Sequence, residues 1–268
     1  MKELTATMHV SLPAGAWPRR TGDPAVGCSL VELYEAMRTT PATRAFTDVA
    51  VPDAVLYRIL DHARFAPSGG NRQGWHVVVL RDPEIRRRIQ ELYDLGWREY
   101  MAHVDAGLVP FAPREQGRWT GPAVDLEAAR AAPRSNPFTE GLDTVPVQLL
   151  LIADLSALAT VDNGLDRQSI VGGASIYPFG HNVLLAARNE GLGGVLTSVL
   201  ARQEPAVREL IGIPDDHAVA GLIALGHPEK TIRRLRRRPV EEFTTVDRFD
   251  GPAFEPPHED EHGSAPVG

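Results

Sequence analysis

Residues 66–80 read APSGGNRQGWHVVVL and place a polar, glycine-containing turn directly before an apolar run. The run WHVVVL (75–80) is rich in aromatic and β-branched residues, which favour a strand. The two glycines suit a turn, but a turn does not explain Asn71 and Gln73. Their amides bring several donors and acceptors to the start of the strand. The stretch therefore predicts the first strand of a sheet, with a hydrogen-bonding loop at its rim.

Further strands and helices are predicted on both sides of this stretch. The apolar runs VPVQLLLIADL (145–155), GGVLTSVL (193–200) and AVAGLIALG (218–226) predict three more strands. Helical spacing of apolar residues predicts five helices: 29–38, 52–63, 83–97, 175–194 and 205–216. The order of these elements predicts an α+β domain with a small central sheet under helices.

Composition excludes several classes of function. The chain of 268 residues has a formal net charge of −7, which argues against a general nucleic-acid or membrane-surface binder. Cys28 is the only cysteine, so neither an intramolecular disulfide nor a cysteine metal cluster can form. The first twenty residues lack the apolar core of a signal peptide, and the longest apolar run, 147–153, is too short for a bilayer. We expect a cytoplasmic protein without a metal site.

Three segments differ from the regular elements. Residues 1–28 read as an irregular N-terminal arm, and residues 244–268 as a polar, Pro-containing tail that we expect to be disordered. Residues 103–145 form a long connection of the kind that is usually a lid or else disordered. Aromatic residues without helical or strand period lie in this connection: Phe111, Trp119 and Phe138. We expect one folded domain over 29–243, with 103–145 as its lid or insertion.

Four polar clusters interrupt the apolar framework. The first, MRTTPATRAF (37–46), combines arginines and hydroxyls and suits a phosphate, although alone it also reads as a turn with surface arginines. The second is the loop APSGGNRQGW. The third, GLGGVLTS (191–198), leads through glycines to two hydroxyls, and the fourth, RRLRRRPVEEF (233–243), is arginine-rich. The glycine fingerprints of Rossmann and P-loop folds are both absent.

In this order the four clusters resemble the flavin-dependent nitroreductase family, over roughly residues 30–243. Arg44-Ala45-Phe46 is similar to the family's R-x-F, and Arg237-Arg238-Pro239 to its final Arg and Pro. The stretch LIGIPDDHAVAGLIALGHPE (210–229) resembles the family's ending. The resemblance implies a nitroreductase-like α+β fold with a mostly antiparallel sheet. It also implies an intertwined homodimer whose terminal segments wrap the partner, with FMN at the interface.

The resemblance also assigns residues to FMN. Arg44 and Arg237 are implied to bind the phosphate, the loop to follow the ribityl chain and ring edge, and residues 196–198 to pass the reactive N5. The complete set of implied cofactor residues is Arg38, Thr40, Arg44, Pro67, Ser68, Asn71, Gln73, Leu196, Thr197, Ser198 and Arg237. Thr40 and Ala42 stand where most members have an Arg and often a Ser, and Arg38 is the candidate replacement.

The activity implied is reduction of nitroaromatic or quinone-type acceptors with NAD(P)H, by ping-pong hydride transfer through flavin N5. No catalytic side chain is required, although Thr197 and Ser198 lie near N5 by resemblance. Two alternatives remain open. A flavin-dependent oxidase or dehydrogenase of a biosynthetic intermediate would keep FMN without NAD(P)H, and the atypical first cluster leaves room for a non-enzymatic flavin-binding protein.

Overall fold

A single four-stranded sheet forms the centre of the protein. The computed structural model describes residues 31–231 and 234–256. The strands are β1 (Trp75–Leu80), β2 (Val147–Asp154), β3 (Gly193–Thr197) and β4 (His217–Gly226). They lie in the order β1-β2-β4-β3 and pair antiparallel throughout. The predicted strands and the small antiparallel sheet are confirmed.

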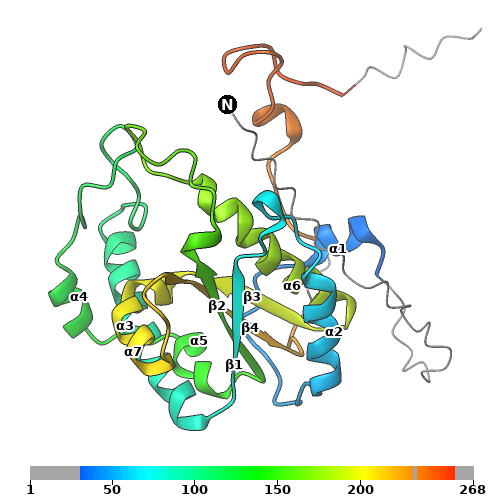
Figure 1. Cartoon of the computed structure of the whole chain (residues 1–268), viewed down its shortest axis with the longest axis vertical. Helices are drawn as coiled ribbons and strands as arrows, with labels where there is room; N and C mark the ends of the chain where they lie inside the picture. Colours follow the sequence, from blue (N-terminus) through cyan, green and yellow to red (C-terminus); the bar gives the residue numbers. More distant parts are fainter. Residues whose placement is uncertain (1–30, 232–233, 257–268) are drawn as a thin grey trace, which may run out of the picture.

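Helices cover both faces of this sheet (Figure 1). On one face lie α2 (Asp53–Ala63) and α6 (Tyr177–Asn189), and α1 (Leu33–Thr39) packs against α6. On the other lie α3 (Pro83–Asp105), α5 (Pro137–Glu140) and α7 (Glu204–Ile211). Successive side chains of a strand point to opposite faces, so Leu149 and Leu151 of β2 pack with α2 and α6, whereas Leu150 and Ile152 pack under α3.

One glycine sets the distance between α6 and the sheet. A Cβ atom at Gly180 would lie 2.4 Å from Leu196 Cδ1 and 3.3 Å from Leu151 Cδ2. Only a residue without a side chain lets the helix approach β3 this closely. The close contact fixes α6 against β3, whose end carries the predicted N5 residues.

The helix α3 is longer than its sequence pattern indicates. The prediction ends at residue 97, whereas the helix continues to Asp105, with Asp82 capping its start. Its last turns bury Gly96, Glu99 and His103, so two polar residues occupy positions that a helical pattern would give to apolar ones. The predicted lid therefore begins inside a helix.

The second half of the predicted lid belongs to the core. Phe138 is buried and packs edge-on against Tyr93, with ring centroids 5.9 Å apart. Leu142, in a following 3₁₀ turn, is fully buried in the same cluster. The expectation that Phe138 is an aromatic residue of a lid is wrong. The surface part of this region is residues 106–135, where α4 (Leu126–Ala131) packs on α3.

The C-terminal segment leaves the body of the domain (Figure 1). Residues 244–254 form a short hairpin, in which Thr245 bridges Ala253 and Val246 N donates to Pro252 O at 2.9 Å. We expect disorder from residue 244 on the basis of composition, but the structure gives 244–254 this hairpin. Residues 257–268 and the predicted arm at 1–28 lie outside the described residues. No helix in the described ranges is both long and apolar enough to span a membrane.

Candidate functional site at the edge of strand β3

Strand β3 is the edge strand that carries Leu196 and Thr197, and Ser198 follows it directly. Along its outer edge, described residues pair at one bridge, between Ala42 and Gly194, where Thr43 N donates to Gly194 O at 2.9 Å. Beyond Gly194 the described part of the chain adds no further strand to this edge. After Gly194 the backbone of β3 therefore has no strand partner on this edge among the described residues, and Ser198 at its end is exposed.

The two arginine-bearing segments run side by side near the start of β3. Thr47 N donates to His227 O at 2.9 Å, Glu229 N to Ala45 O at 3.2 Å, and Leu235 N to Arg38 O at 3.0 Å. The predicted residues Arg38, Thr40, Arg44 and Arg237 lie on these segments. The chain folds this way because the exit from β4 and the entry to α2 share one end of the sheet.

Three predicted phosphate ligands carry positive charges that the fold leaves unneutralised. Arg38, Arg44 and Arg237 are exposed, and none of them forms an ion pair among the residues that the structure describes. The Nη1 of Arg237 donates only to its neighbour's carbonyl, Arg236 O, at 2.8 Å. Exposed arginines without a carboxylate partner suit an anion. Thr40 differs, because its hydroxyl donates to Ala36 O at 2.7 Å.

The loop with Pro67, Ser68, Asn71 and Gln73 has a well-defined internal structure. Ser68 Oγ accepts from Gln73 N at 2.9 Å, and Gln73 Nε2 donates to Asn71 Oδ1 at 3.3 Å. Asn71 and Gln73 have positive φ values of 53° and 52°, which are uncommon for residues other than glycine. Both side chains and Pro67 are exposed. The loop therefore presents two amides to the surface.

This loop and the arginines occupy diagonally opposite corners of the sheet. The loop precedes β1, at the end where Trp75 faces Ala153. Phe46, which precedes α2 and follows Arg44, lies at the opposite end of the sheet, beside the last residue of β4. A Cβ atom added to that residue, Gly226, would lie 3.0 Å from Phe46 and 3.0 Å from Pro146. The two corners are separated by three inter-strand spacings, about 14 Å, across the sheet and by six residues, about 20 Å, along the strands. Within one chain, the two sets of predicted FMN residues do not come together.

A buried tyrosine contacts the predicted N5 residue. Tyr93 of α3 is almost fully buried, and its Oη lies 3.2 Å from Thr197 Oγ1. Burial raises the pKa of Tyr93, while the bond to Thr197 and the positive charge of Arg44 act in the opposite direction. Tyr93 lies on the apolar, buried face of α3, so the helical pattern of the sequence does not reveal this contact. A hydroxyl at an otherwise apolar helical position was the available clue.

A buried carboxylate lies further along α3. Glu99 is fully buried and accepts from three side chains: Arg130 Nε at 2.5 Å, Arg202 Nε at 2.9 Å and Gln203 Nε2 at 3.2 Å. Arg130 belongs to α4, whereas Arg202 and Gln203 lie in the 3₁₀ turn Val199–Gln203, directly after Ser198. Glu99 thus joins the predicted lid to the end of β3, a role that its sequence position does not reveal.

The aromatic residues of the lid pack close to this carboxylate. Phe111 lies 4.4 Å from the ring of His103, and the guanidinium carbon of Arg202 lies 4.6 Å from the Phe111 centroid. Trp119 lies 6.0 Å from Phe111 and is partly exposed. The lid aromatics therefore form one cluster beside the turn that follows Ser198.

Comparison with known proteins decides the family. The model of the nitroreductase family matches residues 37–227, which is most of the chain. The chain belongs to the nitroreductase family.

Individual relatives are distant. Human iodotyrosine deiodinase 1 is 26% identical over 218 residues, covering 79% of this chain and 67% of that protein. A protein of Archaeoglobus fulgidus named as a putative NADH dehydrogenase/NAD(P)H nitroreductase is 26% identical over 200 residues, covering 74% of this chain and 86% of that protein. The structure of oxidised iodotyrosine deiodinase bound to FMN and 3-iodo-L-tyrosine has a TM-score of 0.57 at 19% identity, covering 81% of this chain and all of the other.

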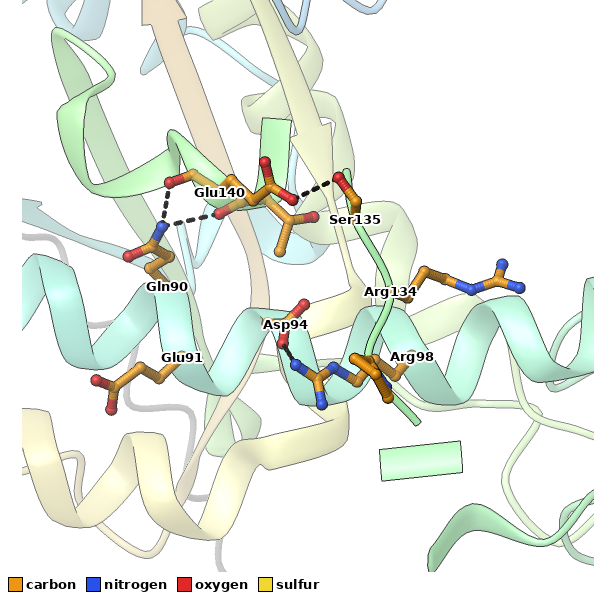
Figure 2. Close-up of a pocket in the computed structure, with 9 residues that line it drawn as sticks. Gln90, Glu91, Asp94, Arg98, Arg134, Ser135 and Glu140 are labelled. Carbon is orange, nitrogen blue, oxygen red and sulfur yellow. Dashed lines mark hydrogen bonds and ion pairs between the residues drawn. The ribbon is translucent and has the colours of Figure 1, made fainter. Parts of the chain in front are cut away.

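Two cavities lie away from the β3 edge of this nitroreductase-family chain. One, of about 470 Å³, opens on the outer side of α3 and has a charged lining that includes Asp94, Arg98 and Glu140 (Figure 2). It contains none of the residues predicted to bind FMN, so we do not assign it to the cofactor. The other, of about 710 Å³, has mostly apolar walls at the start of α6 and includes Gly173 and Tyr177.

The second cavity lies beside the Asn71 and Gln73 loop. Ser175 lies in sequence between the lining residues Ala174 and Ile176, and its Oγ accepts from Gly69 N at 3.0 Å. An apolar cavity next to two exposed amides is the usual composition of a site for a flat, polar-edged ligand. No group of three His, Cys, Asp or Glu side chains suited to a metal ion is found in the described ranges.

Proposed function

We propose that the protein is a homodimeric, FMN-dependent oxidoreductase that uses NAD(P)H to reduce flat aromatic acceptors, such as nitroaromatics or quinones. The observation that carries the proposal is the open edge of β3 in a chain of this family. Unpaired Arg44 lies at one end of that edge, and the hydroxyls of Thr197 and Ser198 lie at the other. The phosphate of FMN and its reactive N5 lie at a distance from each other. In this proposal the arginine serves the phosphate and the hydroxyls lie near N5.

The residues have separate tasks in this proposal. Arg44 and Arg237 hold the phosphate through charge-assisted hydrogen bonds, and Asn71 and Gln73 supply amides for the polar edge of the ring. When bound, FMN supplies hydride transfer at N5, which accounts for the absence of an obligatory catalytic side chain. The lid cluster around Phe111 and Trp119 offers aromatic surface to an acceptor.

A second copy of the chain is required to complete this site. The loop and the arginines lie at opposite corners of one sheet, so we infer that the loop of one protomer faces the arginines of its partner. Exposed apolar side chains support such an interface, because large ones rarely gather on a monomer surface. They lie on α1, on α2 and just after it, and in the C-terminal segment: Leu33, Tyr34, Met37, Tyr57, Phe65, Phe243, Phe249 and Phe254.

Purified protein gives the test. We expect a yellow protein whose flavin absorbance bleaches with NADPH or NADH and returns on addition of a quinone. If NAD(P)H and the acceptor use the same open site, NAD(P)⁺ must leave before the acceptor binds. Initial-rate plots for the two substrates should then be parallel lines, the ping-pong pattern. Bound flavin that NAD(P)H does not reduce would favour the oxidase or dehydrogenase of a biosynthetic intermediate. Bound flavin without any turnover would favour the non-enzymatic binding protein, and a chain that takes up no FMN would contradict the proposal.

We also propose a cytoplasmic location. A single cysteine in 268 residues suits a reducing compartment, in which stability does not depend on disulfides. Fractionation of cells that express the natural protein tests this directly.

A further inference from the structure

The buried pair of Tyr93 and Thr197 has an unused hydrogen-bond donor. Two hydroxyl groups bring two protons to a contact that uses only one of them. Tyr93 Oη and Thr197 Oγ1 lie 3.2 Å apart, and either atom can donate. The structure gives neither hydroxyl a second partner among the described residues, although Tyr93 is 2% and Thr197 9% exposed. A buried donor without an acceptor is costly, so the remaining proton indicates a ligand or a water.

The direction of the bond follows from the acidity of the two groups. A phenol is a stronger donor than an aliphatic alcohol, so the favoured arrangement has Tyr93 donating to Thr197 Oγ1. Burial raises the pKa of Tyr93, which keeps the phenol protonated and able to donate. A hydroxyl that accepts a hydrogen bond becomes a better donor itself. Thr197 O–H is then the unused donor.

Thr197 is well placed to use this proton on a ligand. It is the last residue of β3, on the strand edge that no further strand covers in the described part of the chain. The positive charge of Arg44 acts on Tyr93 and favours a lower pKa of its phenol.

We propose that Tyr93 is a positioning residue that directs the hydroxyl of Thr197, as a donor, toward the flavin at the β3 edge, and so favours the reduced, electron-rich cofactor over the oxidised one. This inference rests on the proposed function. Tyr93 does not touch the cofactor and acts through Thr197.

The test compares the affinities for oxidised and reduced FMN in single and double variants. Tyr93→Phe removes the phenol oxygen and keeps the ring that packs on Phe138, and Thr197→Val removes the hydroxyl at nearly constant volume. For each variant, the Kd of apoprotein for FMN is measured aerobically, and again anaerobically with FMN reduced by dithionite. Tyr100→Phe is the matched control, because it removes a phenol oxygen from the same helix, where the Tyr100 ring stacks on Trp97.

We expect Tyr93→Phe to weaken binding of reduced FMN about fivefold relative to oxidised FMN, as for the loss of one hydrogen bond. Thr197→Val should do the same or more, and Tyr93→Phe should add nothing to it. Thr197→Ser should restore the ratio, and Tyr100→Phe should leave it unchanged. A ratio that Tyr93→Phe does not alter, or two independent and additive effects, would overturn the inference. Wild-type protein that binds neither form of FMN would instead contradict the proposed function.

Discussion

Arg44 is an exposed arginine whose positive charge is not balanced by a carboxylate among the described residues. Most arginines on the described surface have a carboxylate close by, such as Arg81 with Asp53 at 2.5 Å, whereas Arg44 has none. Its hydrogen bonds to phosphate should be worth roughly 1.5–3 kcal/mol. Arg44→Ala should therefore weaken FMN binding by about one to two decades, and Arg237→Ala by a similar amount.

Titration of apoprotein with FMN, followed by quenching of flavin fluorescence, measures this loss. Arg81→Ala is the control, because it removes an equally exposed arginine from another part of the surface. All three variants should unfold at nearly the wild-type temperature. Wild-type affinity in both the Arg44 and the Arg237 variant would remove the phosphate assignment.

Asp162 gives a prediction about pH. It accepts hydrogen bonds from Ile170 N, Arg167 and Ser169, and the Ile170 N–H and Arg167 hold the pKa of its carboxyl well below the ordinary 3.8. When folding lowers the pKa of a carboxyl, its ionised form stabilises the folded protein at pH values above the pKa of the unfolded chain. This stabilisation is lost as the pH falls from that pKa through the lower pKa of the folded protein. The stability difference between wild type and Asp162→Asn should therefore be constant from about pH 8 to 5 and shrink below about pH 4.

Thermal unfolding across this pH range checks the prediction. The loss of stability should extend to the lid, because residues next to Asp162 in the chain contact it: Gln168 N donates to Gly117 O at 2.7 Å, and Arg118 pairs with Asp166. A difference that grows as the pH falls would mean that Asp162 does not carry its charge in the folded protein.

The candidate site residues that the sequence singles out are those that stand outside any apolar period. Asn71, Gln73 and Arg44 interrupt the framework visibly, because no packing role accounts for them. Tyr93 and Glu99 could not be assigned, because they occupy the buried face of α3, where a helical pattern expects apolar residues. Their partners, Thr197, Arg130 and Arg202, are distant in sequence, and only the tertiary fold brings them together.

At the scale of elements, α3 determines where the lid can lie. Its C-terminal turns carry Glu99, which holds Arg130 of α4 and Arg202 of the turn after Ser198. Glu99→Gln keeps the shape of this side chain but removes the charge that balances two arginines. We expect the free energy of unfolding to fall by about 1.5–3 kcal/mol, with faster proteolytic cleavage within residues 106–135.

Acceptor kinetics should change with the lid, while cofactor binding should not. The KM for a quinone should rise severalfold in Glu99→Gln, whereas the Kd for FMN should stay within about twofold, because the phosphate and ring contacts lie elsewhere. Glu91→Gln is the matched control, since Glu91 lies on the same helix with an exposed side chain paired to Arg87 and Arg88. Unchanged cleavage and an unchanged KM would show that residues 106–135 are not held as a lid by Glu99.

Strands were predictable from sequence more fully than helices and connections. Each strand is a short, strongly apolar or β-branched run, and β2 and β4 are central and buried on both faces. The connection from 103 to 145 was not predictable, because α4 and α5 are too short to show a period and Phe138 has no apolar neighbours in sequence. Its division into a surface part and a core part is decided by contacts with α3.

At the scale of the whole molecule, one chain holds the two sets of residues that we propose to bind FMN, and these two sets do not meet. The sheet separates the loop at Asn71 from Arg44, and the C-terminal hairpin exposes Phe249 completely. We therefore predict an obligate dimer with two equivalent FMN sites. Light scattering should give about twice the chain mass of 29.2 kDa for the FMN-loaded protein, and a mass of one chain would contradict the prediction.

Complementation between two damaged chains tests the shared site most directly. One chain carries Arg44→Ala, and the other carries Asn71→Gly and Gln73→Gly, since glycine accepts the positive φ at both positions. Each homodimer has two damaged sites and should bind FMN weakly. A mixed dimer, co-expressed and purified through two different tags, combines the intact loop of one chain with the intact arginine of the other.

If the two chains share each site, the mixed dimer has one tight FMN site with an affinity close to that of wild type. In its second site both halves are damaged. Titration with FMN measures both the number of tight sites and their affinity. If each chain built its site alone, every site in the mixed dimer would keep one defect. Mixed dimers that bind FMN only as weakly as the two parent homodimers would contradict the account.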